Sequence, residues 1–345
     1  MAGSGHIFAG AAATKDDGVG GVFRRAAEGG EWEHVFRQAD VHAITVHPRN
    51  PDIVFAGTKD GPYRSTDRGG HWERLGFPDR DVQVWSIAVD RRDPGTVFAG
   101  GSPVAVYRSD DGGEHFRRMP DPGMPNRVTM SFPCRVMRFA MHPRNPGEVF
   151  ATLEVGGVMR SRDGGESWLD CTQDLVRLAD EPRLKSRILS DTDAEGMLDG
   201  HAVAISDADP DDVILAVRMG LFHSADQGRS WQNMQVGRFS PYTYGRDISV
   251  SPQDPKILYA CLSVAANSQA GALFRSTDTG QTWQRFDQME PHSTVMAVAL
   301  HDRDPDQVYM VARRGEVFGT TDGGRSWREM TLPSVCKDVY ALACG

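Results

Sequence analysis

Imidazole, guanidinium and aromatic side chains recur at one position of a strand-like segment that this sequence repeats. When seven such segments are aligned on their last apolar residues, the position four residues earlier holds His42, Trp85, Met137, His201, Arg246, Met296 and Tyr340. The following position is Ala or Ser in most segments, but two segments have Arg138 and Asp247 there. Polar residues also end the neighbouring strand-like runs, at Lys59, Glu154, Arg218, Arg313 and Arg314.

These residue types, brought together, would suit an anionic or sugar-like small molecule. A guanidinium holds a carboxylate or phosphate through paired N–H donors, and an imidazole can take a proton near neutral pH. If the chain is an enzyme, we therefore expect a hydrolase or lyase with His201 or His42 as general base. The expected ligand-binding residues are Lys59, Trp85, Arg138, Arg218, Arg246, Asp247, Arg313 and Arg314.

The same basic residues also fit a second function, a non-catalytic interaction platform that grips an acidic segment or terminus of a partner protein. A docking surface needs no general base, so the two histidines and Glu154 favour the small-molecule site. Metal binding would need a third ligand at a suitable spacing from His42 and His201, and none is evident. We expect neither a metal nor a cofactor.

The elements that position these residues are set by a motif written six times. Its frame is a hydroxyl residue, Asp two positions later, Gly two further on and an aromatic residue three beyond that, as in STDRGGHW at 65–72. The other copies are 109–116, 161–168, 224–231, 276–283 and 320–327, and 25–32 is an eroded copy. Ser and Asp close turns with their side chains and Gly accepts a positive φ, so each copy predicts a tight turn between strands. Its Asp is expected to bond its own loop.

This frame resembles the Asp-box, or bacterial neuraminidase repeat, of sialidases, xyloglucanases, sortilin-like receptors and photosystem II assembly factors. The resemblance covers almost the whole chain and implies a β-propeller, a fold that those proteins use for different functions. Sialidases bind the substrate carboxylate with three arginines and use a Tyr–Glu nucleophile pair. By that resemblance Arg138, Arg218, Arg246 and Arg314 would form the arginine cluster, and Tyr340 with Glu154 the catalytic pair. The Arg-Ile-Pro stretch of sialidases does not occur here.

Two further strands precede each motif, so one repeat predicts a four-stranded meander of strands A to D. Residues 41–46 alternate in polarity, 47–52 (HPRNPD) carry turn chemistry and 53–58 form a small apolar run. Repeats of about 45 residues with four strands are typical of propeller blades. The chain begins at a B strand, residues 6–10, and ends at an A strand, residues 339–344. We predict one all-β domain over 1–345, a seven-bladed propeller with three-plus-one closure of its first blade.

Insertions should lie on the rim opposite the turn motifs, where D-to-A and B-to-C loops meet. The longest is a partly helical insertion at 172–198, with helical turns expected over 175–178 and 184–189; the others are 121–133, 239–244 and 264–271. Function commonly lies on loops mounted on a rigid scaffold. Because 172–198 is longer than a blade connection needs, we expect a lid over the channel that positions His201. The residues His47, His142 and His301 precede turns on the opposite face and should be structural.

Composition limits the partners. A formal charge of −9 argues against binding to nucleic acid or anionic membranes, and no stretch has the roughly 18 apolar residues of a membrane span. The N-terminus lacks a basic region followed by an apolar core, so no secretory signal is expected. Five scattered cysteines without C-x-x-C fit a reducing compartment. We therefore expect a cytoplasmic protein.

Overall fold

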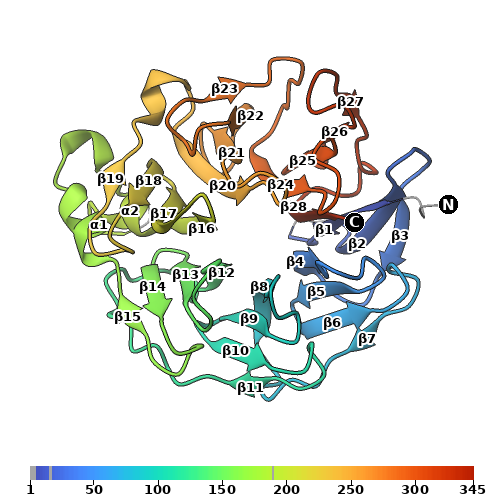
Figure 1. The fold of residues 1–345 in the computed structure, drawn as a ribbon, viewed down its shortest axis with the longest axis horizontal. Coiled ribbons are helices and arrows are strands. Elements are labelled where there is room, and N and C mark those ends of the chain that lie inside the picture. Colours follow the sequence, from blue (N-terminus) through green and yellow to red (C-terminus); the bar gives the residue numbers. More distant parts are fainter. Residues whose placement is uncertain (1–4, 15–17, 189) are drawn as a thin grey trace.

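The computed structural model describes residues 5–14, 18–188 and 190–345, which form a ring of seven four-stranded antiparallel sheets (Figure 1). This is a seven-bladed β-propeller, as the repeats predict. Each blade places its A strand beside the central channel and its D strand at the periphery. Hydrophobic clusters fill the spaces between neighbouring blades.

Blade 1 consists of β28 (Val339–Cys344), β1 (His6–Ala11), β2 (Gly21–Ala26) and β3 (Glu33–Phe36). Blade 2 contains β4 (Val41–Val46), β5 (Val54–Thr58), β6 (Gly61–Ser65) and β7 (Glu73–Arg74). Blade 3 contains β8 (Gln83–Val89), β9 (Val97–Ser102), β10 (Val106–Ser109) and β11 (Arg117–Arg118). Blade 4 contains β12 (Val136–Met141), β13 (Val149–Leu153), β14 (Gly157–Ser161) and β15 (Leu169–Asp170).

Blade 5 contains β16 (Gly200–Ser206), β17 (Asp209–Val217), β18 (Gly220–Ser224) and β19 (Gln232–Asn233). Blade 6 contains β20 (Tyr244–Val250), β21 (Leu258–Ser263), β22 (Gly271–Ser276) and β23 (Gln284–Arg285). Blade 7 contains β24 (Val295–Leu300), β25 (Val308–Ala312), β26 (Val317–Thr320) and β27 (Arg328–Glu329). A single 3-10 turn, η2 (Val236–Arg238), precedes blade 6.

The ring closes by pairing the two ends of the described chain. Strand β28 lies antiparallel to β1, with Ile7 opposite Cys344 and Ala9 opposite Leu342. Beyond the strands, His6 and Gly345 exchange two backbone hydrogen bonds of 2.8 and 3.0 Å. The predicted three-plus-one closure is therefore confirmed, and it leaves no unpaired inner strand.

The repeated motif forms the C-to-D turn of each blade. The Ser65 hydroxyl donates to Asp67 Oδ1 (2.8 Å) and accepts from the Gly69 amide (2.7 Å). Burial opposes ionisation of Asp67, but hydrogen bonds from His71 and Ser65 prevail and lower its pKa to about 2. Equivalent bonds recur in the other well-formed copies, for example in residues 161–165. These aspartates bond their own loops, as expected.

The motif's glycine also packs the blades together. Gly113 has φ +93°, and a Cβ there would lie 2.9 Å from the ring of Phe55 in the preceding blade. Phe55 is fully buried, which stabilises the fold by about 1.5–3 kcal/mol. Gly69 approaches Phe8 in the same way. A residue without Cβ is required because of both the backbone conformation and this contact.

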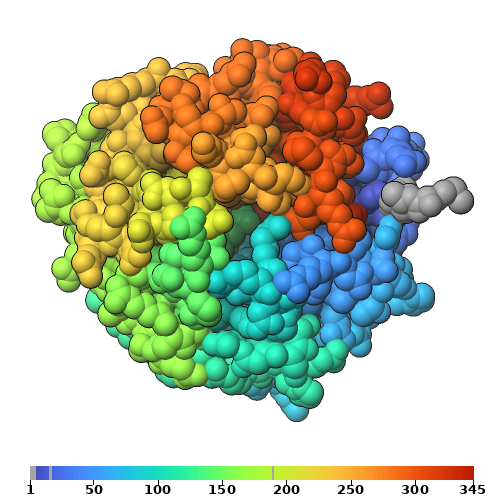
Figure 2. All heavy atoms as spheres, in the orientation of Figure 1, coloured from blue at the N-terminus to red at the C-terminus, as the bar shows by residue number. Residues whose placement is uncertain are grey.

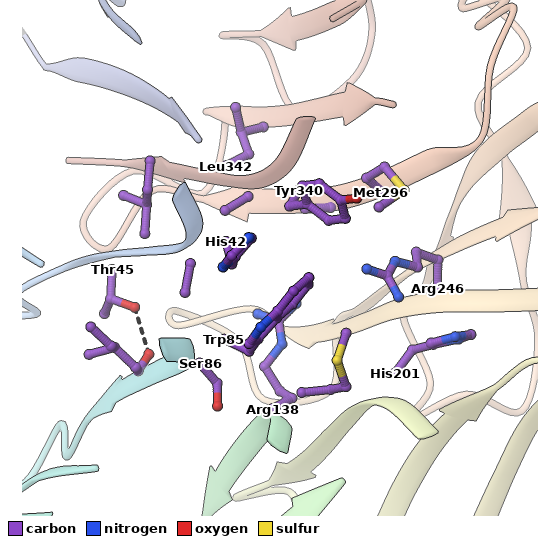
Figure 3. Close-up of a pocket in the computed structure, with 16 residues that line it drawn as sticks. His42, Thr45, Trp85, Ser86, Arg138, His201, Arg246, Met296, Tyr340 and Leu342 are labelled. Atoms are coloured by element: carbon purple, nitrogen blue, oxygen red, sulfur yellow. Dashed lines mark hydrogen bonds between the residues drawn. The ribbon is translucent and has the colours of Figure 1, made fainter. Parts of the chain in front are cut away.

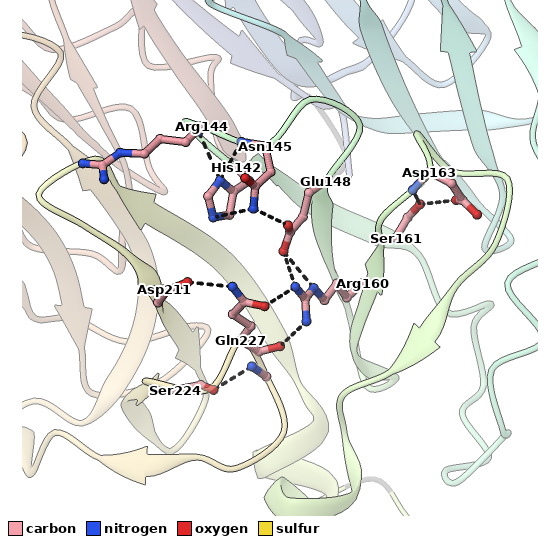
Figure 4. Close-up of polar contacts among 11 residues, drawn as sticks. His142, Arg144, Asn145, Glu148, Arg160, Ser161, Asp163, Asp211, Ser224 and Gln227 are labelled. Carbon is pink, nitrogen blue, oxygen red and sulfur yellow. Dashed lines mark hydrogen bonds and ion pairs between the residues drawn. The ribbon is translucent and has the colours of Figure 1, made fainter.

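A buried arginine joins blades 4 and 5 beneath these turns (Figure 4). Arg160 donates from Nε to Glu148 (2.9 Å) and from Nη1 to the backbone carbonyl of Gln227 (3.3 Å). Nearby, His142 Nδ1 accepts the amides of Arg144 and Asn145 at 3.1 and 3.0 Å. The expected structural role of His142 is therefore confirmed, and His47 and His301 cap their turns with the same pair of bonds.

The 172–198 insertion packs against the side of the ring. It contains α1 (Gln173–Leu178), η1 (Pro182–Leu184) and α2 (Glu195–Leu198), and α1 lies at the outer edge in Figure 1. Leu175, Leu184 and Met197 are buried in one cluster with Trp231 of blade 5. No described residue of the insertion lines the channel pocket, so the expected lid is wrong: its leucines hold it against blades 4 and 5.

The helical turns of the insertion were predicted only in part. The turn expected over 175–178 is present as α1. The turn expected over 184–189 is wrong for residues 185–188, because η1 ends at Leu184 and Lys185 is extended; residue 189 lies outside the described residues. Among the described residues, no helix has the length and apolar character needed to cross a bilayer.

Candidate functional site at the channel mouth

A β-bulge in every A strand positions the residues that face the channel. In blade 2, Val41 pairs with Thr58 and Ala43 with Gly57, so His42 between them has no partner. The same interruption leaves these residues unpaired in the other six blades: Trp85, Met137, His201, Arg246, Met296 and Tyr340. A bulge twists the strand and re-aims its extra side chain. Seven bulges therefore aim seven side chains at one axis.

These seven side chains line a single pocket in the channel, together with Arg138 (Figure 3). The pocket is narrow, with a volume of about 60 Å³. Figure 2 shows the corresponding hollow at the centre of the ring. The convergence expected from the alignment of A strands is thus present, in a space far smaller than an ordinary small-molecule site.

Trp85 is covered on both faces of its indole. The His42 ring stacks on one face, with centroids 3.8 Å apart and planes inclined by 4°. The Arg135 guanidinium lies 3.9 Å from the centroid of the indole, in cation–π geometry. Tyr340 meets the edge of both rings at 5.6 and 5.9 Å. This aromatic cluster forms one wall of the pocket and offers no free aromatic face at Trp85.

The environment of His42 keeps its imidazole neutral. Burial, followed by the charges of Arg135 and Lys59, lowers the pKa of His42 from 6.5 to about 3. Its Nδ1 is buried without a hydrogen-bond partner among the described residues. A general base with so low a pKa is poorly matched to proton transfer near pH 7.

His201 is held by contacts at both ring nitrogens. Nδ1 donates to the Gly245 carbonyl at 2.7 Å, and Nε2 faces two other polar groups. Nε2 lies 3.1 Å from the Tyr244 hydroxyl and 3.4 Å from Asp199 Oδ1. Burial raises the pKa of Tyr244 well above its usual range, so the phenol is a donor. No nitrogen of His201 is left free for a substrate proton.

A buried ionic network links His201 to the insertion. Arg218 contacts Asp199 at 2.7 Å and Glu195 at 3.1 Å. Although burial opposes it, the charges of His201 and Arg218 hold the pKa of Asp199 well below its usual range. Glu195 is fully buried and also accepts the amides of Ile188 and Ser190 at 3.0 Å. The insertion therefore positions His201 from the side, through charge pairs.

Most other cations at this rim are paired. Arg138 contacts Asp247 at 2.9 Å, and the fully buried Asp247 also accepts the Val298 amide of blade 7 at 3.1 Å. Arg313 contacts Asp338 at 2.8 Å and lies over Tyr340. Arg135 lies 2.5 Å from Glu154, whose pKa is raised by burial.

Arg246 is the exception among the side chains of the pocket. It is half-buried and lines the channel, as Figure 3 shows. No hydrogen bond or ion pair joins its guanidinium to any residue of the described ranges. Burying part of a charge without a partner costs free energy, which a bound anion would recover.

The structure separates the expected site residues into two groups. His42, Trp85, Arg138, His201, Arg246 and Tyr340 line the pocket. The others do not: Lys59, Glu154, Arg218, Asp247, Arg313 and Arg314. All of these except Asp247 follow the end of a B strand. The B strand is the second strand of a blade and lies farther from the channel axis than the A strand, so these residues lie outside the pocket. Tyr340 and Glu154, suggested as a catalytic pair, are thus divided between the two groups.

Sequence reasoning missed the acidic and basic partners two residues upstream of the seven bulged residues. That position holds Asp40, Gln83, Arg135, Asp199, Tyr244, Thr294 and Asp338, a polar residue in every blade. Side chains two residues apart in a strand share a face, so a longer alignment of A strands could have found them. Among the described residues no group of three His, Cys, Asp or Glu side chains is placed to hold a metal ion.

Comparison with known proteins identifies relatives of the fold. The family model described as "Sortilin, neurotensin receptor 3" matches residues 271–343. A curated xyloglucanase from Paenibacillus is 25% identical over 52% of this chain, which spans only 19% of that protein's length. The solved GH74 enzyme of Niastella koreensis matches with a TM-score of 0.64 at 14% identity, covering 85% of this chain and 45% of its own.

A second solved structure matches over most of both chains. YCF48 bound to D1 peptide aligns with a TM-score of 0.53 at 14% identity, covering 84% of this chain and 82% of its own. At these identities the solved structures show the fold alone. This chain is a seven-bladed propeller resembling those of GH74 xyloglucanases and of YCF48.

Proposed function

We propose that this protein is a non-catalytic interaction propeller, which binds a carboxylate of a partner polypeptide at the channel mouth. The observation that carries the proposal is the unpaired guanidinium of Arg246. Four neighbouring arginines, at 135, 138, 218 and 313, each have an acidic partner within 3.1 Å. Arg246 is thus the arginine of the pocket that has no direct acidic partner among the described residues, which suits a single carboxylate.

The state of the two histidines supports binding over catalysis. His42 has a pKa of about 3, and both nitrogens of His201 have contacts within the protein. Neither imidazole combines a free nitrogen with a pKa near neutral pH, as a general base requires. Both side chains instead shape the wall of the pocket.

The size of the pocket supports a narrow anionic group over a sugar. Its volume of about 60 Å³ compares with the roughly 300–1,000 Å³ of common small-molecule sites. Sugar rings in proteins stack on open aromatic faces, but both faces of Trp85 are covered by His42 and Arg135. A carboxylate on an extended chain could enter where a ring could not.

The comparisons support a polypeptide as the partner. The solved structure that matches over 82% of its own chain is YCF48 bound to D1 peptide. The GH74 match extends over less than half of that enzyme.

Fluorescence anisotropy with labelled peptides tests the proposal. We expect saturable binding of a peptide with a free C-terminal carboxylate and weaker binding of the same peptide as its amide. Arg246→Ala should weaken binding at least tenfold, as loss of a hydrogen bond to a charged group implies. Arg229→Ala, an exposed arginine in the turn motif of blade 5, is the control and should bind like wild type. Equal affinity of the acid and the amide would contradict the proposal.

Glycoside hydrolysis remains a second candidate because of the Paenibacillus xyloglucanase match. In that case Glu154, with its raised pKa, would be the acid catalyst. Release of reducing ends from xyloglucan oligosaccharides measures this activity. Its presence in wild type and its loss in Glu154→Gln, with unchanged thermal stability, would favour the enzyme over the interaction module.

A further inference from the structure

A second pocket lies at the end of the channel opposite the mouth. The pocket at the mouth is lined by the bulged residues of the A strands, whereas this one is lined by the second halves of the A strands of blades 3 to 6 and by the turns that follow them. We call it the lower pocket. Its volume is about 460 Å³, compared with about 60 Å³ at the mouth. A cavity of this size is within the range of common small-molecule sites.

The wall of the lower pocket is mainly apolar. Three positions after the bulge, the A strands of blades 3 to 6 have the small residues Ala88, Ala140, Ala204 and Ser249. The next position in each strand holds Val89, Met141, Ile205 and Val250. Apart from Ala204 these side chains are only half-buried, so part of this surface is exposed to solvent. Covering exposed apolar surface is favourable, and the small residues leave the room for a ligand that would cover it.

The charged side chains that line the lower pocket are paired within the protein. Three ion pairs at its rim have N–O distances of 3.4, 2.7 and 2.5 Å: Arg92–Asp90, Arg144–Asp207 and Arg91–Asp302. At the inner end of the pocket, Arg138 contacts Asp247 at 2.9 Å. Each arginine and each aspartate of the lining thus has a partner of opposite charge. An anion bound there would bring an uncompensated charge into a partly apolar site, which costs free energy.

Arg138 offers hydrogen-bond donors to a ligand in this pocket. Its side chain is 44% exposed and lines both pockets. The fully buried Asp247 fixes its position, because Asp247 also accepts the amides of Ile248 and Val298 at 3.0 and 3.1 Å. A guanidinium has five N–H donors, and the hydrogen bond to Asp247 uses one of them. The exposed donors can bind an acceptor oxygen without any need for a negative charge on the ligand.

We propose that the lower pocket binds a neutral, largely apolar small molecule that has a carbonyl group. Its apolar body packs on Met141 and Val250, and its carbonyl oxygen accepts from Arg138. The ligand differs in class from the carboxylate at the mouth because the charges differ: Arg138 is compensated by Asp247, whereas Arg246 has no acidic partner among the described residues. The site is a second one, and the two pockets have Arg138 in common.

The probe for the test is Prodan, a neutral naphthalene ketone whose fluorescence shifts to shorter wavelength in apolar surroundings. The wild-type full chain should bind it saturably, with this shift and with a Kd below about 200 μM. The analogue in which a carboxylate replaces the ketone has the same ring system but a negative charge. It should bind at least tenfold more weakly, because the charges of the pocket are already paired.

A matched pair of valine variants locates the binding. Val250→Asp places a charge in the apolar wall and should weaken Prodan binding at least tenfold. Val46 has the same strand position in blade 2, is also half-buried and lies outside the lower pocket. Val46→Asp should therefore bind Prodan like wild type. Thermal unfolding of both variants shows whether they fold to the same extent.

A matched pair of arginine variants tests the contact with the carbonyl group. Arg138→Lys keeps a positive charge opposite Asp247 but loses the planar fork of donors, and it should weaken Prodan binding about tenfold. Arg144→Lys makes the same change in an exposed arginine that is paired with Asp207 and lies outside the pocket. It should leave the affinity unchanged.

Failure of the wild-type chain to bind Prodan saturably would overturn the proposal. So would equal or tighter binding of the carboxylate analogue, equal losses in the two valine variants, or wild-type affinity in Arg138→Lys. Arg246→Ala should leave Prodan binding unchanged, so the outcome is separate from that of the site at the mouth.

Discussion

At the scale of single residues, the channel mouth is a set of charges that are almost all neutralised within the protein. Arg218 has two carboxylates, Asp199 and Glu195, and Arg313 has the fully buried Asp338. Buried charges are tolerated when they are paired, because a charge without a partner loses its hydration without compensation. Arg246 has no such partner among the described residues of the pocket, and for that reason we propose that it binds the anion.

The neutral state of His42 makes a prediction about pH. The pKa of His42 is about 3 in the folded chain and 6.5 in the unfolded chain. Between these two pH values the imidazole is therefore protonated in the unfolded state and neutral in the folded state. The contribution of His42 to stability therefore falls as pH decreases through this window. His42→Phe retains a ring on Trp85 but cannot titrate.

Urea unfolding at pH 7, 5.5 and 4 checks this prediction. The free energy of unfolding of wild type, relative to His42→Phe, should decrease steadily from pH 7 to pH 4. Other titrating groups are common to both proteins and cancel in the difference. A difference that does not change with pH would show that His42 is not held neutral by burial.

At the scale of elements, the A strand and its bulge determine what the channel presents. The sequence alignment identified all seven bulged residues, since a repeated strand keeps its side chains in register. The bulge itself could not be predicted, because it depends on how two strands pair and not on one strand's pattern. Arg135 and Asp199, which the sequence alignment did not identify, show the same limit. Their roles in the site depend on contacts with residues of other segments, such as Trp85 and Arg218.

The 172–198 insertion illustrates a second limit of sequence reasoning. Its length suggested a lid, but length does not say which surface a loop packs on. Leu175 and Met197 are buried between blades 4 and 5, and Glu195 is buried against Arg218. The insertion therefore packs against the side of the ring. It is connected to the channel only through Asp199 and His201, which follow it in the sequence.

This arrangement predicts that Glu195 stabilises the fold. Glu195→Ala removes the acceptor of the Ile188 and Ser190 amides and one partner of Arg218, so the free energy of unfolding should fall by about 2–3 kcal/mol. Glu181→Ala, an exposed acid in the same insertion, should change it by less than about 0.5 kcal/mol. Chemical denaturation of both variants measures the effect. Similar values for the two would contradict the stabilising role of Glu195.

At the scale of the whole molecule, the architecture was the part most completely predicted. Six copies of one turn motif and four strands per repeat identify a propeller, and the positions of the first and last strands predict the closure. Fold similarity alone does not select a function, because the same architecture occurs in GH74 enzymes and in YCF48. Function has to be argued from the pocket and its charges.

The closure makes a prediction about the whole ring. Deleting residues 339–345 exposes the edge of β1 and removes Val339 and Leu342 from a buried cluster shared with blade 7. We expect the truncated chain to lose cooperative thermal unfolding and to aggregate, because an unpaired inner strand invites association. Calorimetry and size-exclusion chromatography test this, and a monomer with an unchanged Tm would refute the closure's importance.

The central claim, that Arg246 receives a carboxylate at the channel mouth, is tested most directly by crystallography. The measurement is a structure of the wild-type protein crystallised with a saturating concentration of an N-acetylated tripeptide that has a free C-terminal carboxylate. We predict electron density for the carboxylate within hydrogen-bonding distance of the Arg246 guanidinium, beside Tyr340 and Met296. Peptide density at another surface with the channel empty, or no peptide density at saturation, would contradict the claim.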